Sequence, residues 1–469
     1  MRRIWTVALL TTSMMASPVM AMAQSDEGAA LRAELDALRA QMAAMQHRLD
    51  ALDAQAAHGS ADEASRSAAA PIENSAIAPT PSASAPALPT PASLDQIVWR
   101  GAPEWKNDAG WSFKPRGRIQ VDFAGVDSPA GVTEDRGGFR TELRRIYFGA
   151  DGKIPGGFSY RVEADFANGI ELTDAYLRYG TGPAHVSIGH MKTFSGLDDM
   201  TSDLYLSLME RASFTQAFGF QRRVGIAGQY AAGDMLLQGG VFGANAEDLA
   251  DDKNNAIAAD LRAVWSPNVG DDILLHLGGS LHMRNLNDSN ATVRYRARPG
   301  AHTTDLRLVD TGNIAAKGER SFGLEAAVRH GPFHAMAEGY WQKVRRIGGA
   351  DPSFFGGYAE LGMVLTKGDQ RGYKEGAFDR LKPSRPITKG GPGAIEVNLR
   401  YDHISLNDQD IIGGKQQTAW IGLVWAPIDY VRLTANYGRM WISDARVAAA
   451  DGRTKYQADT LGLRTQIDF

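Results

Sequence analysis

The carboxyl-terminal stretch Tyr456-Gln-Ala-Asp-Thr-Leu-Gly-Leu-Arg-Thr-Gln-Ile-Asp-Phe469 alternates between apolar and polar side chains. Successive side chains of a β-strand point to opposite faces, so this segment has one apolar face and one polar face. Such a strand covers the core of a soluble sheet, or it shows hydrocarbon to lipid and polar groups to the lumen of a transmembrane barrel. The rest of the sequence has to decide between these two settings.

Sixteen segments that follow residue 111 have the alternation and composition of strands. Their even number, their lengths of about ten residues or more, and the alternation of long and short connections favour a closed barrel over a soluble sandwich. We therefore predict an all-β transmembrane barrel of sixteen antiparallel strands, wide enough to leave an aqueous channel. The predicted strands are 112–124, 138–151, 157–168, 171–179, 184–192, 220–231, 234–243, 256–265, 272–284, 318–330, 332–346, 354–366, 393–405, 413–426, 429–442 and 456–469.

The second predicted strand breaks the alternation, because Arg144 and Arg145 are adjacent. One of the two would face lipid, which costs roughly 2–4 kcal/mol at the membrane centre. A β-bulge or a position at headgroup level would remove this conflict.

The amino terminus has the features of a secretory signal peptide over residues 1–23. Arg2 and Arg3 precede an apolar run over residues 4–16, and Ala21-Met-Ala23 supplies a small-x-small cleavage site. The chain has no cysteine, so it offers no disulfide and no thiolate metal site. No later apolar run is long enough for a transmembrane helix.

Two further regions precede the predicted barrel, which we place at residues 94–469. Residues 24–55 carry apolar residues at alternating spacings of four and three, which predicts an α-helical coiled coil in the periplasm; a single amphipathic helix packed on the protein's own surface is the alternative. Residues 56–93 are rich in Ala, Ser and Pro and predict an extended linker. The coiled-coil seam consists of Leu35, Leu38, Met42, Met45, Leu49 and Leu52.

Three stretches of the predicted barrel resemble the phosphate-selective porin O/P family of bacterial outer-membrane porins. The first is Glu142-Leu-Arg-Arg-Ile-Tyr-Phe-Gly-Ala-Asp-Gly-Lys153 followed by Tyr160-Arg-Val-Glu-Ala-Asp-Phe166. The second is Ile188-Gly-His-Met-Lys-Thr-Phe-Ser-Gly-Leu197 with Met209-Glu-Arg211. The third is Leu365-Thr-Lys-Gly-Asp-Gln-Arg-Gly-Tyr373 with Gly393-Ala-Ile-Glu-Val-Asn-Leu-Arg-Tyr401.

The resemblance implies a homotrimeric porin of the Gram-negative outer membrane, whose pore is narrowed by inward-folded loops and guides anions with arginines and lysines. The constriction loop would be 193–219, which contains no Lys or Arg between residues 194 and 209 but carries Asp198, Asp199 and Asp203. The segments 285–317 and 367–392 are further candidates for inward folding.

Several basic side chains are candidates for lining the pore and binding anions. The alternative for each is an ion pair with a neighbouring carboxylate of the lumen, and both interpretations stay open. Six of the 50 Lys and Arg and nine of the 54 Asp and Glu lie in residues 1–94, which leaves 44 and 45 for the rest. Anion preference would therefore need local clustering of positive charge. The candidates are Arg118, Arg145, Arg161, Lys192, Arg400, Arg432 and Arg464.

The sequence thus predicts a water-filled diffusion channel for small hydrophilic solutes, with a preference for anions such as phosphate or pyrophosphate. The alternative is a non-selective general porin that also tethers the outer membrane to peptidoglycan through its coiled coil. The expected partners are two further copies of the chain, outer-membrane lipid and lipopolysaccharide, and small anionic solutes, with no nucleic acid. No nucleophile, metal or nucleotide motif is present, so we expect neither an enzyme nor a cofactor.

Overall fold

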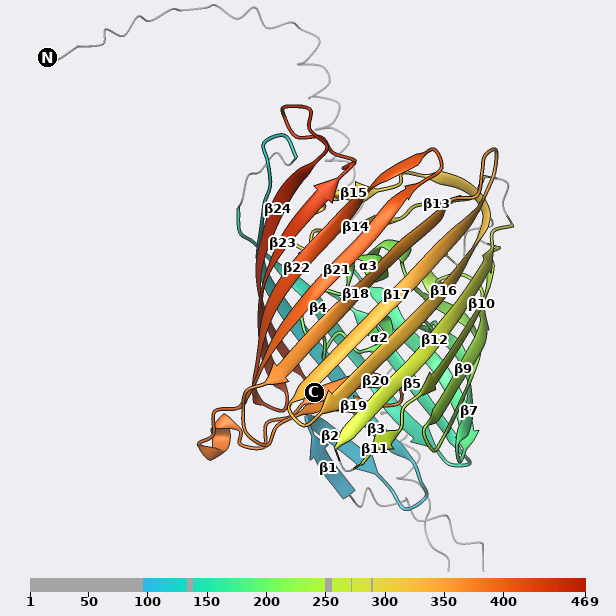
Figure 1. The fold of residues 1–469 in the computed structure, drawn as a ribbon. Helices are drawn as coiled ribbons and strands as arrows, with labels where there is room; N and C mark the ends of the chain where they lie inside the picture. The colour runs from blue at the N-terminus through green and yellow to red at the C-terminus, as the bar shows by residue number, and fades with distance from the viewer. Residues whose placement is uncertain (1–95, 133–137, 249–254, 271, 288–289) are drawn as a thin grey trace, which may run out of the picture. The chain divides into compact units, whose positions relative to one another are not determined.

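Sixteen long strands close into one antiparallel barrel (Figure 1). The computed structural model describes residues 96–469 except 133–137, 249–254, 271 and 288–289, and these residues lie in the unit Pro89–Phe469. The wall consists of β3 (Ser112–Asp127), β4 (Arg140–Ile154), β5 (Phe158–Asp165), β6 (Glu171–Thr181), β7 (Ala184–Lys192), β8 (Arg222–Ala232), β9 (Met235–Phe242), β10 (Ile257–Trp265), β12 (Ile273–Asn285), β16 (Ile314–His330), β17 (Phe333–Arg346), β18 (Ser353–Val364), β21 (Ala394–Asp408), β22 (Ile411–Ile428), β23 (Val431–Ser443) and β24 (Tyr456–Asp468).

The barrel closes because the last strand pairs with the first. In the β24–β3 ladder, Ile467 lies opposite Ile119 and Arg464 lies opposite Asp122. Closure leaves no unpaired sheet edge in the membrane, where no water is present to satisfy it. The predicted sixteen-stranded barrel is confirmed, with each predicted strand found at its place in the chain.

The alternation of β24 follows the prediction. Leu461, Leu463 and Ile467 are each 45–50% exposed on the outer face, whereas Arg464 and Gln466 are 4% exposed and face the lumen. The two faces of this strand therefore separate lipid from the interior of the barrel.

A β-bulge resolves the conflict between the adjacent arginines of β4. Arg145 lies opposite Gln120 and Leu143 lies opposite Val121, so Arg144 is the extra residue. Its Nε donates a hydrogen bond of 3.2 Å to Oε1 of Glu210 inside the barrel. Both arginines therefore avoid the lipid face.

The connections between wall strands alternate in length, which defines two ends of the barrel. We call the end with turns such as 182–183, 233–234 and 331–332 the short-turn end, and the opposite end the loop end. The short-turn end also holds the hairpin of β1 (Gln96–Arg100) and β2 (Ala102–Lys106) and the two-residue strand β11 (Asn268–Val269) (Figure 1). Two connections depart from this rule: the long connection 365–393 begins and ends at the short-turn end, and the two-residue turn 409–410 lies at the loop end.

Shorter elements belong to the connections, and most of them lie in three long ones. Among the described residues, no helix is long and apolar enough to cross a membrane. These elements are α2 (Leu197–Met200), α3 (Ser213–Phe218), η1 (Ala246–Asp248), β13 (Thr292–Val293), β14 (Arg296–Ala297), β15 (Val309–Asp310), β19 (Arg371–Lys374), β20 (Ala377–Leu381) and η2 (Ile387–Lys389).

The predicted signal peptide, coiled coil and linker, over residues 1–93, lie outside the described residues. The coiled-coil seam and the tether to peptidoglycan therefore stay predictions.

The candidate pore constriction

Three segments enter the lumen and narrow it: the loop 193–221, the loop 286–313 and the β19–β20 hairpin of the connection 365–393. The first carries α2 and α3, the second β13 to β15, and the third the β19–β20 hairpin (Figure 1). A large apolar cluster forms where the first two segments meet the inner wall, and it includes Phe214, Phe218, Tyr295, Tyr340 and Tyr358. The hydrophobic core of this barrel therefore lies inside it and fills part of the lumen.

Glycines of the wall make room for the loop 193–221. A Cβ atom placed on Gly356 would lie 2.3 Å from Cβ of Phe214, and one on Gly422 would lie 2.5 Å from Cδ2 of Leu208. These distances are far below van der Waals contact. The loop consequently sits against bare backbone, and larger wall residues would displace it.

Three of the predicted anion-binding arginines hold this loop instead of lining open space. Arg400 pairs with Glu360 at 2.7 Å and lies 3.7 Å from Asp198. Arg432 donates hydrogen bonds to the backbone carbonyl oxygens of residues 204 and 206. Arg464 pairs with Asp122 and with Glu210, at 2.7 Å in each case. For these three residues the structure favours the interpretation that each satisfies carboxylates and carbonyls of the lumen.

The acidic residues of the loop face basic partners. Asp198 accepts hydrogen bonds from the backbone amide of Ala212 at 3.1 Å and from Oγ1 of Thr215 at 2.7 Å. Asp199 accepts one from Oγ of Ser195 at 2.6 Å and lies 3.3 Å from Nζ of Lys192. These two aspartates therefore order the loop and do not present free negative charge to the lumen.

Asp203 joins the loop to the first two strands of the wall. It pairs with Arg118 of β3 and with Arg145 of β4, the latter at 2.8 Å. Burial opposes ionisation of Asp203, but the two guanidinium groups outweigh burial and hold its pKa well below the usual range. Asp203 therefore remains charged at neutral pH.

The connection 365–393 also places arginines in the lumen. Arg371 lies 3.5 Å from Glu396 and 3.7 Å from Glu360 and donates to Oγ of Ser207. Arg380 pairs with Asp468 near the end of β24. The hairpin is thereby fixed to both the wall and the loop 193–221.

The loop 286–313 contributes bulk more than charge to the lumen. Arg294 pairs with Asp310, and Gly300 lies against the ring of Trp420, where a Cβ atom would be 2.0 Å from Cη2. Gly300 also has a φ of +70°, which favours glycine. None of the four arginines of this loop is among the described residues that line the cavity discussed next.

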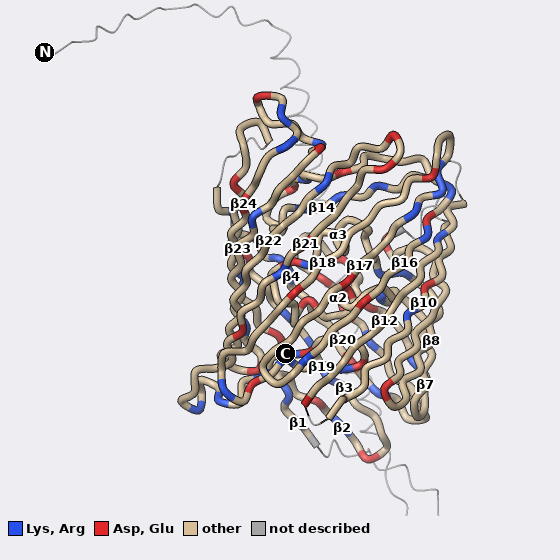
Figure 2. The backbone as a smooth tube through the Cα atoms, viewed as in Figure 1, with Lys and Arg blue, Asp and Glu red and all other residues tan. Residues whose placement is uncertain are grey.

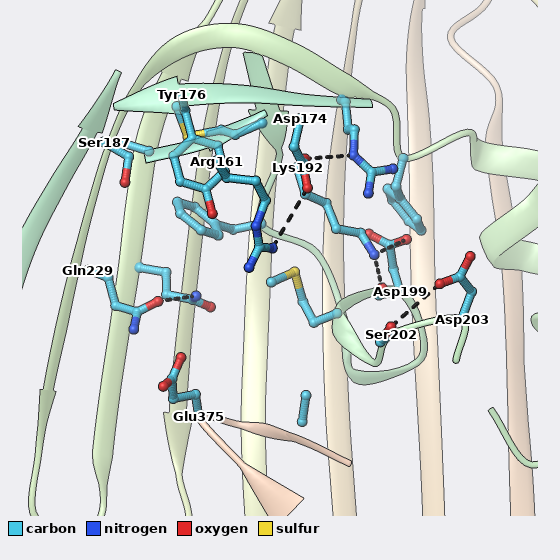
Figure 3. A pocket seen from close by; sticks show the side chains of 18 of the residues that line it. Arg161, Asp174, Tyr176, Ser187, Lys192, Asp199, Ser202, Asp203, Gln229 and Glu375 are labelled. Atoms are coloured by element: carbon cyan, nitrogen blue, oxygen red, sulfur yellow. Dashed lines mark hydrogen bonds and ion pairs between the residues drawn. The ribbon is translucent and has the colours of Figure 1, made fainter. Parts of the chain in front are cut away.

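The open part of the lumen is a cavity of about 650 Å³ between β3 to β9, the loop 193–221 and the β19–β20 hairpin (Figure 3). Nine Lys and Arg and five Asp and Glu are among the described residues that line it. Over residues 95–469 the two signs are nearly equal, and Figure 2 shows them interspersed along the wall and the inserted segments. The basic lining residues are Arg116, Arg118, Arg145, Arg161, Arg178, Lys192, Arg211, Arg222 and Lys374.

Most of these cations already have a carboxylate partner. Arg161 lies 2.7 Å from Asp151 and 3.8 Å from Asp174, and Arg222 lies 2.9 Å from Asp174. Figure 3 shows Arg161 and Lys192 on neighbouring sides of the cavity, each directed to its carboxylate. A shared carboxylate neutralises only part of the charge of two guanidinium groups.

Arg178 differs from its neighbours, because no ion pair between it and a carboxylate is found within the described part of the chain. Its Nε donates a hydrogen bond of 3.1 Å to Oγ of Ser187, and its guanidinium lies 5.4 Å from the ring centre of Tyr176. The guanidinium of Arg161 lies 6.0 Å from the same ring. Two cations therefore flank one tyrosine on the cavity wall.

A smaller cavity of about 190 Å³ continues toward the short-turn end. Arg116, Arg118 and Tyr205 line both cavities, and Lys114 and Arg380 line the smaller one. Basic side chains thus also line the open space nearer the short-turn end, together with Asp151, Glu163 and Asp468.

The structure divides the predicted basic residues into two groups. Arg118, Arg145, Arg161 and Lys192 line the larger cavity, whereas Arg400, Arg432 and Arg464 do not. Sequence reasoning missed Arg116 and Arg178, although Arg116 shares strand parity with Arg118, and Arg178 with Asp174. It also missed Arg211, Arg222 and Lys374, which lie at strand ends or on inserted segments where parity gives no information.

Comparison with known proteins places the chain in a family. The family model described as phosphate-selective porin O and P matches residues 113–469. The chain belongs to this family. Its members are outer-membrane channel proteins and not enzymes.

The chain is similar to two further proteins and to one solved structure. A protein of Caulobacter vibrioides described as uncharacterized is 40% identical over 480 residues, which cover 99% of this chain and 95% of that protein. Porin O of Pseudomonas aeruginosa is 28% identical over 374 residues, covering 70% of this chain and 83% of that porin. In-vitro folded OmpT, an outer membrane protein of Vibrio cholerae, shares the fold with a TM-score of 0.50 at 12% identity, covering 78% of this chain and 99% of OmpT.

Proposed function

We propose that this porin is a diffusion channel for small hydrophilic solutes that prefers anions, with phosphate and pyrophosphate as the expected solutes. The observation that carries the proposal is the excess of basic over acidic side chains around the 650 Å³ cavity. The barrel as a whole has no such excess, so the positive charge is concentrated where a solute would pass.

The chemistry of the cavity suits phosphate-like anions. Guanidinium groups present several N–H donors in a plane and bind phosphate oxygens in a bidentate manner, replacing part of the hydration shell. Arg178 supplies such a group without a competing carboxylate among the described residues, and Arg161 shares Asp151 and Asp174 with other arginines. An anion would move from one of these partly neutralised cations to the next, so each cation binds the anion weakly enough for it to leave again.

Planar bilayers test the sign of the selectivity. Under a potassium chloride gradient, we expect a reversal potential that reports anion preference, and phosphate added on one side should reduce the chloride current. A reversal potential of the opposite sign would contradict the anion preference, and a chloride current insensitive to phosphate would contradict the proposed solute.

We also propose the assembly and orientation that the family resemblance implies. Three copies would form a homotrimer, the loop end would face the cell exterior, and the short-turn end and residues 24–93 would face the periplasm after removal of residues 1–23. Outer-membrane barrels carry short periplasmic turns and longer extracellular loops, which supports this orientation. Native mass spectrometry of the mature porin, with and without residues 24–93, tests the trimer and the role of the coiled coil. A monomer in both cases would contradict the proposed trimer.

A further inference from the structure

The outer wall carries two unlike surfaces along the tilted strand β17, one near the loop end and one nearer the middle of the membrane (Figure 1). The outward-facing residues of this strand, read from the loop end toward the middle of the membrane, are first basic, then aromatic, then small. They are Arg345, Lys343, Trp341, Gly339, Ala337 and Ala335.

The basic part extends over the neighbouring strand β16. Arg320 lies directly opposite Lys343 in the β16–β17 ladder, and both side chains are exposed on the outer face. Like charges directly opposite each other destabilise a sheet unless something neutralises them. Arg345, one step nearer the loop end, donates to Oδ1 of Asn285 at 2.6 Å and to the carbonyl of Lys317 at 3.0 Å.

No carboxylate pairs with Arg320, Lys343 or Arg345 among the residues that the structure describes. The nearby carboxylates are engaged elsewhere: Asp410 pairs with Arg346, and Asp351 accepts a hydrogen bond of 2.9 Å from the Arg346 amide. The three cations thus form an uncompensated group at the loop end of the barrel, where Figure 2 shows basic segments on β16 and β17.

A row of neighbouring aromatic rings marks the next level below the cations. The ring centres of Phe322 and Trp341 are 5.4 Å apart, and those of Trp341 and Phe355 are 5.0 Å apart. Aromatic rows of this kind lie at the boundary between the hydrocarbon and the headgroups. The cations above this row are therefore at headgroup level.

An apolar groove of about 770 Å³ opens below the rings. Ala326, Ala337 and Ala359 are cross-strand neighbours and form its floor, and Leu361 and Leu399 flank it. From Lys343 to Ala337 the strand advances six residues, or about 20 Å. A lipid with an anionic headgroup and acyl chains has this sequence of chemistries over this length.

We propose that β16 and β17 bind one phosphorylated glycolipid of the outer leaflet, with Arg320, Lys343 and Arg345 on its phosphate and its acyl chain in the alanine groove. The ligand is a lipid and not a free anion, because the cations lie on the outer wall and the same strand carries an apolar groove nearer the middle of the membrane. The proposal rests on the orientation proposed above and is independent of the ion selectivity of the pore.

Binding of lipid A to the detergent-solubilised porin tests the site. Fluorescence of the tryptophans, which include Trp341 within the site, reports the titration. R320Q/K343Q should bind diphosphorylated lipid A roughly tenfold or more weakly, because each cation near a charged headgroup contributes substantially to binding. Dephosphorylated lipid A should bind the wild type and this variant alike.

Two further variants make the test specific. Ala337→Phe fills the groove from the exposed face and should weaken binding of both forms of lipid A severalfold while leaving the headgroup cations in place. R439Q/K455Q is the matched control, because it also removes two cations from outside the lumen, one on the outer wall and one in a loop. Arg439 already lies 3.7 Å from the carboxylate of Asp459, so lipid A should bind this control as it binds the wild type.

Four results would overturn the site. The first is equal affinity of the wild type for phosphorylated and dephosphorylated lipid A, and the second is a loss of lipid A affinity in R439Q/K455Q equal to that in R320Q/K343Q. The third is that millimolar inorganic phosphate competes as effectively as lipid A does. The fourth is a loss of oligomers in R320Q/K343Q without weaker lipid binding. The last result would assign the surface to a contact between copies. An unchanged single-channel conductance of R320Q/K343Q verifies that the barrel has folded.

Discussion

At the scale of single residues, arginines in one lumen have different roles that depend on their neighbours. Arg464 is 4% exposed and is held between two carboxylates beneath the loop 193–221. Arg178 is half-buried on the cavity wall and, among the described residues, has only a serine oxygen and a tyrosine ring as partners. The first is a structural group, and the second is available to a passing anion.

Replacement of Arg178 by glutamine tests the second role. The variant should fold normally, because the change leaves no buried carboxylate without a partner, and its anion preference should fall measurably. Reversal potentials of Arg178→Gln and of Arg439→Gln, an outward control, are compared under the same salt gradient. A shift of equal size in both variants would show that the change in net charge, and not the position in the cavity, is responsible.

Replacement of Arg464 by methionine tests the first role. Asp122 would lose its partner in a buried site, while Glu210 would keep Arg144, and the loss of one partner of a buried pair destabilises a protein by about 3–5 kcal/mol. Denaturant unfolding in detergent, followed by tryptophan fluorescence, should show this loss. If Arg464→Met unfolds at the wild-type midpoint, these carboxylates do not depend on Arg464.

At the scale of elements, the loop 193–221 depends on a wall shaped to receive it. Gly422 borders Leu208. A Cβ atom placed on Gly462 would lie 2.6 Å from Sδ of Met209. Met209 donates its backbone amide to Oδ1 of Asn436 at 3.0 Å, so the same short stretch is fixed by packing and by hydrogen bonding. The position of the loop, and with it the shape of the cavity, is set by these contacts.

Substitution of Gly422 by leucine should push the loop away from β22 into the open side of the lumen. We expect a smaller single-channel conductance, because the loop borders the 650 Å³ cavity. The outward-facing neighbour variant Leu423→Ile keeps the loop contact and should conduct like the wild type. Equal conductance of Gly422→Leu and wild type would mean that the loop accommodates the added side chain elsewhere.

The ion pairs of this loop also predict its dependence on pH. Burial opposes ionisation of Asp199, Asp203 and Glu210, but neighbouring cations outweigh burial and lower the pKa of each. A carboxylate with a lowered pKa in the folded state stabilises the fold above its unfolded pKa of about 4, and this contribution is lost as the pH falls below that value.

Conductance should consequently remain constant from about pH 8 to pH 5, and the protein should become easier to unfold below about pH 4. Single-channel recordings and thermal unfolding over this range measure the two effects. Asp203→Asn should flatten the acid branch of the stability curve. A loss of conductance already at pH 6 would contradict this role of the aspartates.

At the scale of the whole molecule, the barrel is a wall around a partly filled interior. The β19–β20 hairpin comes from the short-turn end and contributes residues 374, 375 and 377–379 to the cavity. Arg371 and Arg380 anchor it to Glu396 and Asp468. The inserted segments, and not the number of strands alone, therefore define the pore.

Replacement of residues 370–382 by a short glycine-serine linker should raise the single-channel conductance severalfold, because it removes one side of the cavity. The barrel should remain folded, since the hairpin forms no part of the wall ladder. Heat-modifiability on electrophoresis checks folding. An unchanged conductance of the folded variant would show that the narrowest point lies elsewhere.

The sequence by itself determined the wall. Period-two alternation, as in Leu461 to Phe469, and the contrast between short turns and long loops predict the sixteen strands and their faces, because both follow from local backbone geometry. The family resemblance indicated that the loop 193–219 folds inward, and the broken alternation at Arg144 and Arg145 indicated either a bulge or a headgroup-level position, of which the structure shows the bulge.

Only the tertiary structure decided which charges are available to a solute. Arg161 and Arg400 both have inward-facing parity and the same charge in the sequence, but Arg161 lines the cavity with a partly exposed side chain, whereas Arg400 is buried beneath a loop. The difference comes from contacts between residues far apart in the chain, such as those of Asp198 and Glu360 with Arg400. Alternation reports the face on which a side chain lies, whereas the neutralisation of its charge depends on the segment that folds over it.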